Sequence, residues 1–199
     1  MPEPRRTETP HRILDIAEQL AQTCGFNGFS YADIALQMRV TKASLHYHFP
    51  TKAELGRALV ARYRVKFLEA LDAIDREAPR ADARLQRYAD LYYQVMRNDR
   101  MCLCGMFAAE YATLPPPMQE ELRHFFDANE AWLIRVLEGG RQAGELAFRG
   151  PSRDRARIML GTLEGAMLIA RAYADDGRFR PVAEHLLNEL APAAQPGHV

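Results

Sequence analysis

Residues 26–55 of this 199-residue chain read FNGFSYADIALQMRVTKASLHYHFPTKAEL, and they predict two short helices followed by the start of a longer one. Ser30 can accept a hydrogen bond from the free amides of a first helical turn, and Asp33 can answer from the third position. A helix is therefore expected to begin at Tyr31. Its apolar residues, Ile34, Ala35 and Met38, recur at helical spacing and give it one buried face.

The second short helix is expected to follow Thr41, which is the next N-cap candidate. Leu45 and Phe49 stand four residues apart and supply its buried face, and Pro50 ends it. Its outer face carries hydrogen-bond donors, a small surface and a flat ring on Lys42, Ala43, Ser44, His46 and Tyr47. These groups suit phosphates, base edges and thymine methyls, so the pattern indicates the reading helix of a helix-turn-helix.

Thr51 and Glu54 form another capping box, which starts the long helix. Lys52 lies in its first turn, where its amide and side chain can meet a phosphate. The apolar pattern continues from Leu55 towards Ile74, so this helix is expected to belong to two domains. We place a DNA-binding domain in residues 1–55 and a second helical domain in residues 56–199.

These residues resemble the N-terminal domain of the tetracycline-repressor (TetR) family of transcriptional regulators. The matching residues are Gly25-Phe26, Phe29-Ser30, Ile34-Ala35 and the run from Val40 to Lys52. The resemblance implies an all-α homodimer that holds a palindromic, double-stranded operator when empty. A small-molecule inducer in the larger C-terminal domain would release it. The family's DNA-contacting positions fall on Ser30, Tyr31, Thr41, Lys42, Ala43, Ser44, His46, Tyr47, His48 and Lys52.

Two residues depart from the family pattern. Arg39 stands where members usually have glycine, at a turn position that often needs a left-handed backbone, which costs another residue roughly 1 kcal/mol or more. His46 stands where members often have tyrosine, which changes one contact with the DNA backbone. The operator sequence is therefore not transferable from the resemblance.

Composition places the chain among soluble globular proteins, with 48% hydrophobic and 26% charged residues. Residues 1–9 contain no apolar run, so we expect neither a signal peptide nor a membrane span, and a cytoplasmic location. The three cysteines do not suggest a disulfide framework, which agrees with a reducing compartment.

The formal net charge is zero, but its distribution is uneven. Residues 1–66 hold ten Lys/Arg against six Asp/Glu, a net of +4, and residues 67–199 hold sixteen against twenty, a net of −4. Chance scatter of surface charge is the alternative, but the positive end coincides with the helix-turn-helix. The basic residues Arg57, Arg62, Arg64 and Lys66 have two interpretations, a solvated face or long-range attraction to DNA.

The rest of the chain predicts further helices. One spans residues 12–24 and ends at a C-cap glycine, Gly25. The others are expected at residues 84–98, 101–111, 118–142, from Ser152 through 158–173, and 181–190. A break is expected at Asn98-Asp99 and a stop at the proline run 115–117.

The central helices are expected to hold the inducer pocket. Large apolar residues, one cysteine and aromatic rings are its candidate lining: Tyr92, Met96, Cys102, Met106, Phe107, Tyr111, Phe125, Phe126, Trp132 and Met167. Plain core packing is the alternative for each, because pockets and cores draw on the same residue types.

The last two helices meet their symmetry mates in the resembling family, and small residues here permit close packing. The candidate interface is Leu160, Leu163, Met167, Ala170, Leu186, Leu187 and Leu190. The alternative makes the first of these helices the central helix of a monomer. A paired operator requires a symmetric protein, which favours the dimer.

Cys102 and Cys104 are the chemically distinctive pair of the C-terminal half. Burial as small hydrophobes, a thiol that senses electrophiles or oxidants, and a metal site with a histidine all remain open. Side chains two residues apart on a helix diverge by about 200°, so a disulfide between them would be strained. Some family members that sense electrophiles carry a cysteine at the position of Cys102.

Two other classes of protein compete with a regulator. No phosphate-cradling glycine loop, metalloprotease helix or nucleophile elbow is present, so neither an enzyme nor a cofactor is expected. His46 and His48 point to different sides of a helix and make a poor metal chelate. A helical small-molecule carrier without a DNA role would leave the surface chemistry of residues 42–52 unexplained.

Overall fold

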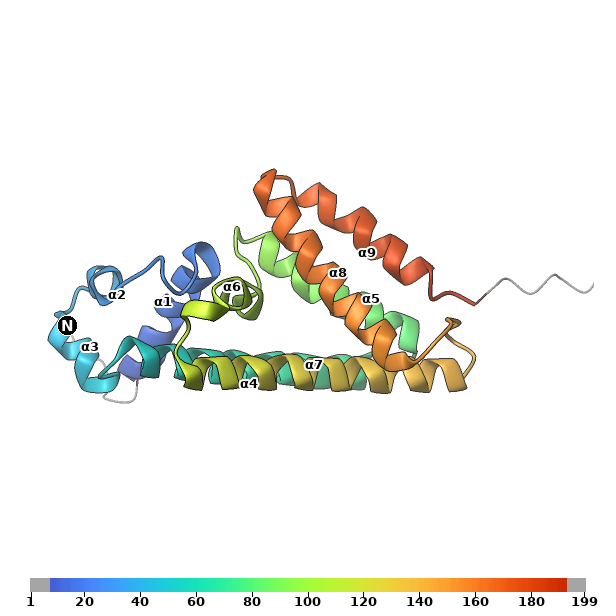
Figure 1. Cartoon of the computed structure of the whole chain (residues 1–199), viewed down its shortest axis with the longest axis horizontal. Coiled ribbons are helices and arrows are strands. Elements are labelled where there is room, and N and C mark those ends of the chain that lie inside the picture. The colour runs from blue at the N-terminus through green and yellow to red at the C-terminus, as the bar shows by residue number, and fades with distance from the viewer. Residues whose placement is uncertain (1–7, 193–199) are drawn as a thin grey trace, which may run out of the picture. The chain divides into compact units, whose positions relative to one another are not determined.

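The structure is a computed structural model that describes residues 8–192 (Figure 1). In that range the chain forms nine α-helices, two short 3-10 turns and no strand, which confirms the all-α class. The helices are α1 Glu8–Cys24, α2 Tyr31–Met38, α3 Lys42–His48, α4 Lys52–Glu77, α5 Ala81–Met96, α6 Leu103–Ala109, α7 Pro116–Gln142, α8 Ser152–Ala172 and α9 Phe179–Asn188. The 3-10 turns η1 and η2 span Tyr111–Thr113 and Asp176–Arg178.

The predicted caps of the helix-turn-helix are confirmed. The Ser30 amide donates to Asp33 at 2.7 Å while the Ser30 hydroxyl accepts from Ala32 at 3.2 Å. The Thr41 hydroxyl accepts from the Ser44 amide at 3.3 Å and so starts α3. Thr51 and Glu54 exchange two hydrogen bonds of 3.1 Å at the start of α4. Side chains thus satisfy amides that helix starts leave without partners.

Arg39 adopts the left-handed conformation expected of its position, with φ 58° and ψ 43°. Its amide donates to the carbonyl groups of Ala35 and Leu36 and closes the last turn of α2. The chain therefore makes the tight turn between α2 and α3 without glycine.

Several helix limits differ from the predicted ones, among them the start of α6, at Leu103 and not at 101, and the start of α9, at Phe179 and not at 181. α1 begins at Glu8, earlier than residue 12, and α5 begins at Ala81, three residues before 84. α7 begins inside the proline run, at Pro116. Proline fits a first helical turn because its missing N–H would have no intrahelical partner there.

The chain divides into two compact units. The first comprises residues up to Lys66 with Arg100–Phe126, and the second comprises Phe67–Asp99 with the residues from Asp127 onward. α4 and α7 each contribute residues to both units. The boundary at residue 55, between the predicted DNA-binding domain and the rest of the chain, remains a prediction.

In the first unit, α1 packs on α2 and α6, α2 packs on α3, and ion pairs join α1 to the N-terminal part of α4. Ile13, Ile34, Leu45 and Leu59 are buried there to within 1% exposure. At Gly56 a Cβ atom would lie 2.4 Å from Met118 and 2.8 Å from the Phe26 ring. Glycine at this position lets α4, α7 and the turn before α2 approach this closely without a shift of the Met118 side chain.

In the second unit, α5, α8 and α9 pack on one another. Its core contains a polar cluster in which the Tyr88 hydroxyl donates to Asn129 at 2.8 Å and Asn129 donates to the Tyr92 hydroxyl at 3.3 Å. All three residues are buried, and their hydrogen bonds satisfy one another. Across residues 8–192, every helix is too short or too polar to span a bilayer.

Candidate DNA-binding site

The outer face of α3 is exposed as predicted from the sequence. Leu45, 1% exposed, anchors the helix to the first unit, while Tyr47 on the other side is 72% exposed. Thr41, Lys42, Ala43 and His46 are exposed too, and Ser44 and His48 are half-buried. The helix thus presents a cation, a ring and small side chains to solvent, which are the groups that contact phosphates and base edges.

A depression lies between the start of α2 and α3. Two cationic side chains, Lys42 and Lys52, contribute to its lining. The lining residues are Phe29, Ser30, Tyr31, Ala32, Lys42, His46 and Lys52. Five of the ten residues predicted to contact DNA therefore surround one concave surface.

Tyr31 joins α2 to α3 more than it faces solvent. Its ring lies 4.5 Å from the His46 ring, and its hydroxyl donates to the carbonyl oxygen of Phe49 at 2.7 Å. Burial raises the pKa of Tyr31 to about 12, with a smaller contribution from the Glu54 carboxylate. The hydroxyl therefore remains a donor at physiological pH, and we assign Tyr31 to positioning α3.

Lys52 differs from its sequence interpretation. Its ammonium donates to the carbonyl oxygens of Phe26, at 2.6 Å, and Phe29, and it lies 4.5 and 4.6 Å from the centres of their rings. Burial lowers the pKa of Lys52, while the Glu110 carboxylate acts in the opposite direction. With two of its three N–H groups engaged, Lys52 first holds the turn before α2. A phosphate contact remains a prediction that rests on the third N–H.

Three of the four basic residues of α4 form ion pairs within the first unit. This is neither the solvated face nor the long-range attraction to DNA that the sequence suggests. Arg62 pairs with Asp15 at 2.8 Å and with Glu18 at 2.6 Å, and Lys66 reaches Glu18 at 3.2 Å. Arg64 pairs with a glutamate of α7. These cations tie α4 to its neighbours within the first unit, and Arg57 alone of the four is not part of these pairs.

The residue that sequence reasoning missed is Glu110, at the end of α6. Its carboxylate accepts hydrogen bonds from the amides of Phe26 and Asn27, which stand 84 and 83 residues away. No local pattern reveals a contact at that separation.

The predicted inducer residues fall in both units, so their joint pocket remains a prediction. Most are buried, and the exceptions are Tyr111, at 38% exposure, and the half-buried Met106 and Phe126. Cys102 is buried immediately before α6, and its sulfur accepts a weak hydrogen bond from the Tyr63 hydroxyl at 3.9 Å. Cys104 is buried as well, whereas Cys24 is exposed.

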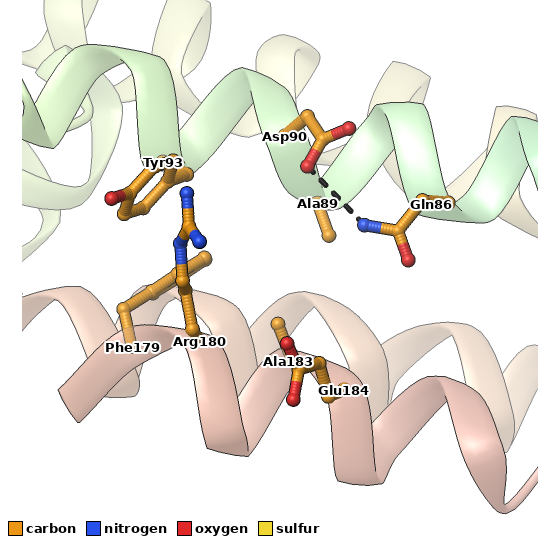
Figure 2. A pocket seen from close by; sticks show the side chains of 8 residues that line it. All are labelled: Gln86, Ala89, Asp90, Tyr93, Phe179, Arg180, Ala183 and Glu184. Atoms are coloured by element: carbon orange, nitrogen blue, oxygen red, sulfur yellow. Dashed lines mark hydrogen bonds between the residues drawn. The ribbon is translucent and has the colours of Figure 1, made fainter. Parts of the chain in front are cut away.

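A groove in the second unit runs between α5 and α9 (Figure 2). The rings of Tyr93 and Phe179 stack at 6.2 Å, and the Arg180 guanidinium covers Tyr93 at 4.4 Å. Asp90 and Glu184 add carboxylates from the two helices. Its volume of about 210 Å³ is below the roughly 300–1,000 Å³ of small-molecule sites. The lining does not overlap the predicted inducer residues.

The predicted dimer surface of α8 and α9 requires correction. Leu163, Met167 and Ala170 are fully buried within their own chain, as are Leu186 and Leu190 to within 6%. Leu160 and Leu187 are half-buried. The sequence does not distinguish the inner from the outer face of these helices, because apolar residues recur at helical spacing on both.

The outward face of α8 carries another apolar stripe. Ile158, Ile169 and Tyr173 are 50%, 57% and 63% exposed, and Gly161 and Gly165 lie between them on the same face. A Cβ atom at either glycine would meet no atom of the described chain within 4 Å. The backbone of α8 is thus open to close approach.

A short second helix with an exposed outer face, packed on two others, is the arrangement by which helix-turn-helix proteins enter the major groove. The molecule is therefore of the class of DNA-binding regulators with a helical C-terminal domain. The sequence matches the family described as bacterial regulatory proteins, tetR family, over residues 13–59. It also matches the tetracyclin repressor-like C-terminal domain over residues 81–186.

Two solved structures are similar over nearly their whole length. A TetR-family transcriptional regulator from Agrobacterium tumefaciens is 31% identical, with a TM-score of 0.90 over 93% of this chain and 98% of that one. A TetR regulator from Legionella pneumophila is 31% identical, with a TM-score of 0.80 over 96% and 100%. The transcriptional regulator AcuR of Cereibacter sphaeroides is 29% identical over 74% of this chain and 69% of its own. The chain belongs to the TetR family of transcriptional regulators.

Proposed function

We propose that this regulator is a repressor that binds an inverted-repeat operator as a homodimer and leaves it when a small-molecule inducer binds. The exposed face of α3 beside the depression at the start of α2 carries this proposal. The exposed side chains of α3 lie next to a depression that Lys42 and Lys52 help to line, and we expect these groups to contact the bases and phosphates of one face of a duplex.

The dimer is proposed to form through the outward stripe of α8. Exposed apolar side chains flank Gly161 and Gly165, which allow a second helix to approach closely. A symmetric dimer places two reading helices about 34–36 Å apart, or a multiple of that distance, and so selects a two-fold symmetric operator. We expect such a regulator in the cytoplasm.

Selection of DNA fragments from the source genome tests this function. Purified protein should enrich a few fragments that share an inverted repeat, and footprinting should protect both half-sites. Enrichment no greater than for random DNA of the same length would refute operator binding. A small helical carrier without a DNA role would give that result.

A thiol-sensing repressor is the second candidate for the inducing signal. Cys102 lies directly before α6 and within reach of the Tyr63 hydroxyl, so its modification would disturb the packing of that helix. Its burial opposes rapid reaction because a reagent must first enter the core. A non-covalent inducer needs no such reaction and is our preferred signal.

A further inference from the structure

Two charged side chains form hydrogen bonds to the turn Gly25–Phe29, which lies between α1 and α2. On one side the Glu110 carboxylate accepts from the amide of Phe26 at 2.6 Å and from that of Asn27 at 3.3 Å. On the other side the Lys52 ammonium donates to the carbonyl oxygens of Phe26 and Phe29. An anion thus holds the amides of this segment and a cation holds its carbonyl groups, and bonds to charged groups are the stronger kind.

Residues 101–113, around Glu110, make further contacts with the turn or with the end of α1. The Asn27 side chain donates to the Thr113 hydroxyl at 2.8 Å, just after α6. The Phe26 ring meets the Phe107 ring of α6 edge-on at 5.7 Å. Before α6, the Met101 amide donates to the carbonyl oxygen of Gln22 at 3.1 Å. Residues before α6, within it and after it thus contact the end of α1 or the turn.

Gly25 shows how closely the carboxylate lies. Its φ of +79° suits glycine, and a Cβ atom there would also lie 2.6 Å from a carboxylate oxygen of Glu110. A side chain at position 25 would therefore meet both backbone strain and a clash.

We infer that Glu110 is a positioning residue for DNA binding, which holds the turn Gly25–Phe29 so that Ser30 and the start of α2 face the DNA. Ser30 directly follows this turn and caps α2, so any shift of the turn moves the start of α2 and the depression beside it. The inference rests on the proposed function. DNA affinity then depends on where the end of α6 lies.

The direction in which DNA affinity changes after one substitution separates a positioning role from simple electrostatics. Removal of a carboxylate from the DNA-binding unit strengthens attraction to phosphates if only net charge matters. Loss of the hydrogen bonds between Glu110 and the turn weakens DNA binding instead. Glu110→Ala is therefore compared with Glu120→Ala, which removes an exposed carboxylate of α7 in the same unit.

Affinity for a genome-selected fragment is measured by fluorescence anisotropy at several salt concentrations. We expect Glu110→Ala to bind about tenfold more weakly or worse, because two charge-assisted hydrogen bonds to the turn are lost. Its salt slope should equal that of the wild type because Glu110 contacts no phosphate. Glu120→Ala should bind as the wild type does or slightly more tightly. Binding of Glu110→Ala as tight as that of Glu120→Ala would overturn the inference.

Hydrogen exchange and a milder variant keep the result interpretable. The amides of Phe26 and Asn27 should exchange at least about tenfold faster in Glu110→Ala only, since they lose their acceptor. If Glu110→Ala does not fold, Glu110→Gln decides, because it keeps one acceptor oxygen. Weakened binding of Glu110→Gln supports the positioning role, and unchanged binding together with faster exchange of both amides refutes it. Wild-type protein that selects no DNA would refute the proposed function itself, a different result from an unaffected variant.

Discussion

The rings of Tyr31 and His46 lie 4.5 Å apart with a tilt of 44°, so α2 and the reading helix α3 contact each other through two residues of the candidate DNA surface. His46 is also tied down, because its Nδ1 lies 3.0 Å from the carbonyl oxygen of Pro50. The orientation of α3 therefore depends on side chains that do not themselves need to read a base.

Tyr31→Phe should lower the free energy of unfolding by about 1 kcal/mol, because the carbonyl oxygen of Phe49 loses its hydroxyl donor. The effect should depend on pH. The fold raises the Tyr31 pKa from 10.0 to about 12 and so favours the neutral hydroxyl. That stabilisation is complete below pH 10 and is lost as pH rises towards 12. Urea unfolding at pH 8 and pH 11 should show the difference between wild type and variant shrinking at the higher pH. An equal difference at both values would contradict the assigned role.

Lys42→Ala and Lys52→Met should weaken DNA binding in different ways. Lys42 is exposed on α3, so its loss should reduce affinity for all sequences and lower the salt slope by about 0.9 if it contacts one phosphate. Lys52 is engaged by two carbonyl oxygens, so its loss should lower the melting temperature and the affinity with little change of slope. Salt titrations of both variants check this. A slope lowered equally by both would restore Lys52 to direct phosphate contact.

Ile169→Arg should dissociate the proposed dimer and leave the monomer folded. The residue is 57% exposed on α8, so arginine is tolerated in the free chain. Burying an unpaired cation between two helices costs several kcal/mol. Val65→Arg is the matched control, since Val65 is 49% exposed on α4. Sedimentation should show monomers for the first variant and dimers for the second. An intact dimer of Ile169→Arg would place the interface elsewhere.

The cysteines offer a test of the two inducing signals. Cys24 is exposed and Cys102 is buried, so a mild electrophile should modify Cys24 first. If the signal is non-covalent, treated wild type and treated Cys102→Ser should stay on operator DNA equally well. Release of the wild type with resistance of Cys102→Ser would establish the thiol-sensing candidate.

Local chemistry made the N-terminal part of this fold predictable. Ser30, Thr41 and Thr51 each cap a helix where the sequence places them, because capping needs only neighbours three residues away. The left-handed turn at Arg39 followed from one position in a matched pattern. These features depend on short-range contacts alone.

The remaining features depend on contacts between distant residues. The sequence predicts a phosphate contact for Lys52, because no local signal shows that the carbonyl oxygens of Phe26 and Phe29 accept hydrogen bonds from it. For a similar reason, the sequence predicts the inner face of α8, and not its outer face, as the dimer surface. Leu163 and Ile169 are both apolar at helical spacing, and only their burial, 0% against 57% exposure, tells them apart.

The most direct test of the central claim, that α3 reads operator DNA, is the affinity of wild type and Tyr47→Ala for a selected fragment and for its scrambled version. Tyr47 is 72% exposed at the centre of the proposed reading face, so its removal should not unfold α3. The account predicts that Tyr47→Ala loses about tenfold or more on the selected fragment and little on the scrambled one, because base contacts specify and phosphate contacts do not. Equal affinity of the two proteins for the selected fragment at moderate salt would contradict it.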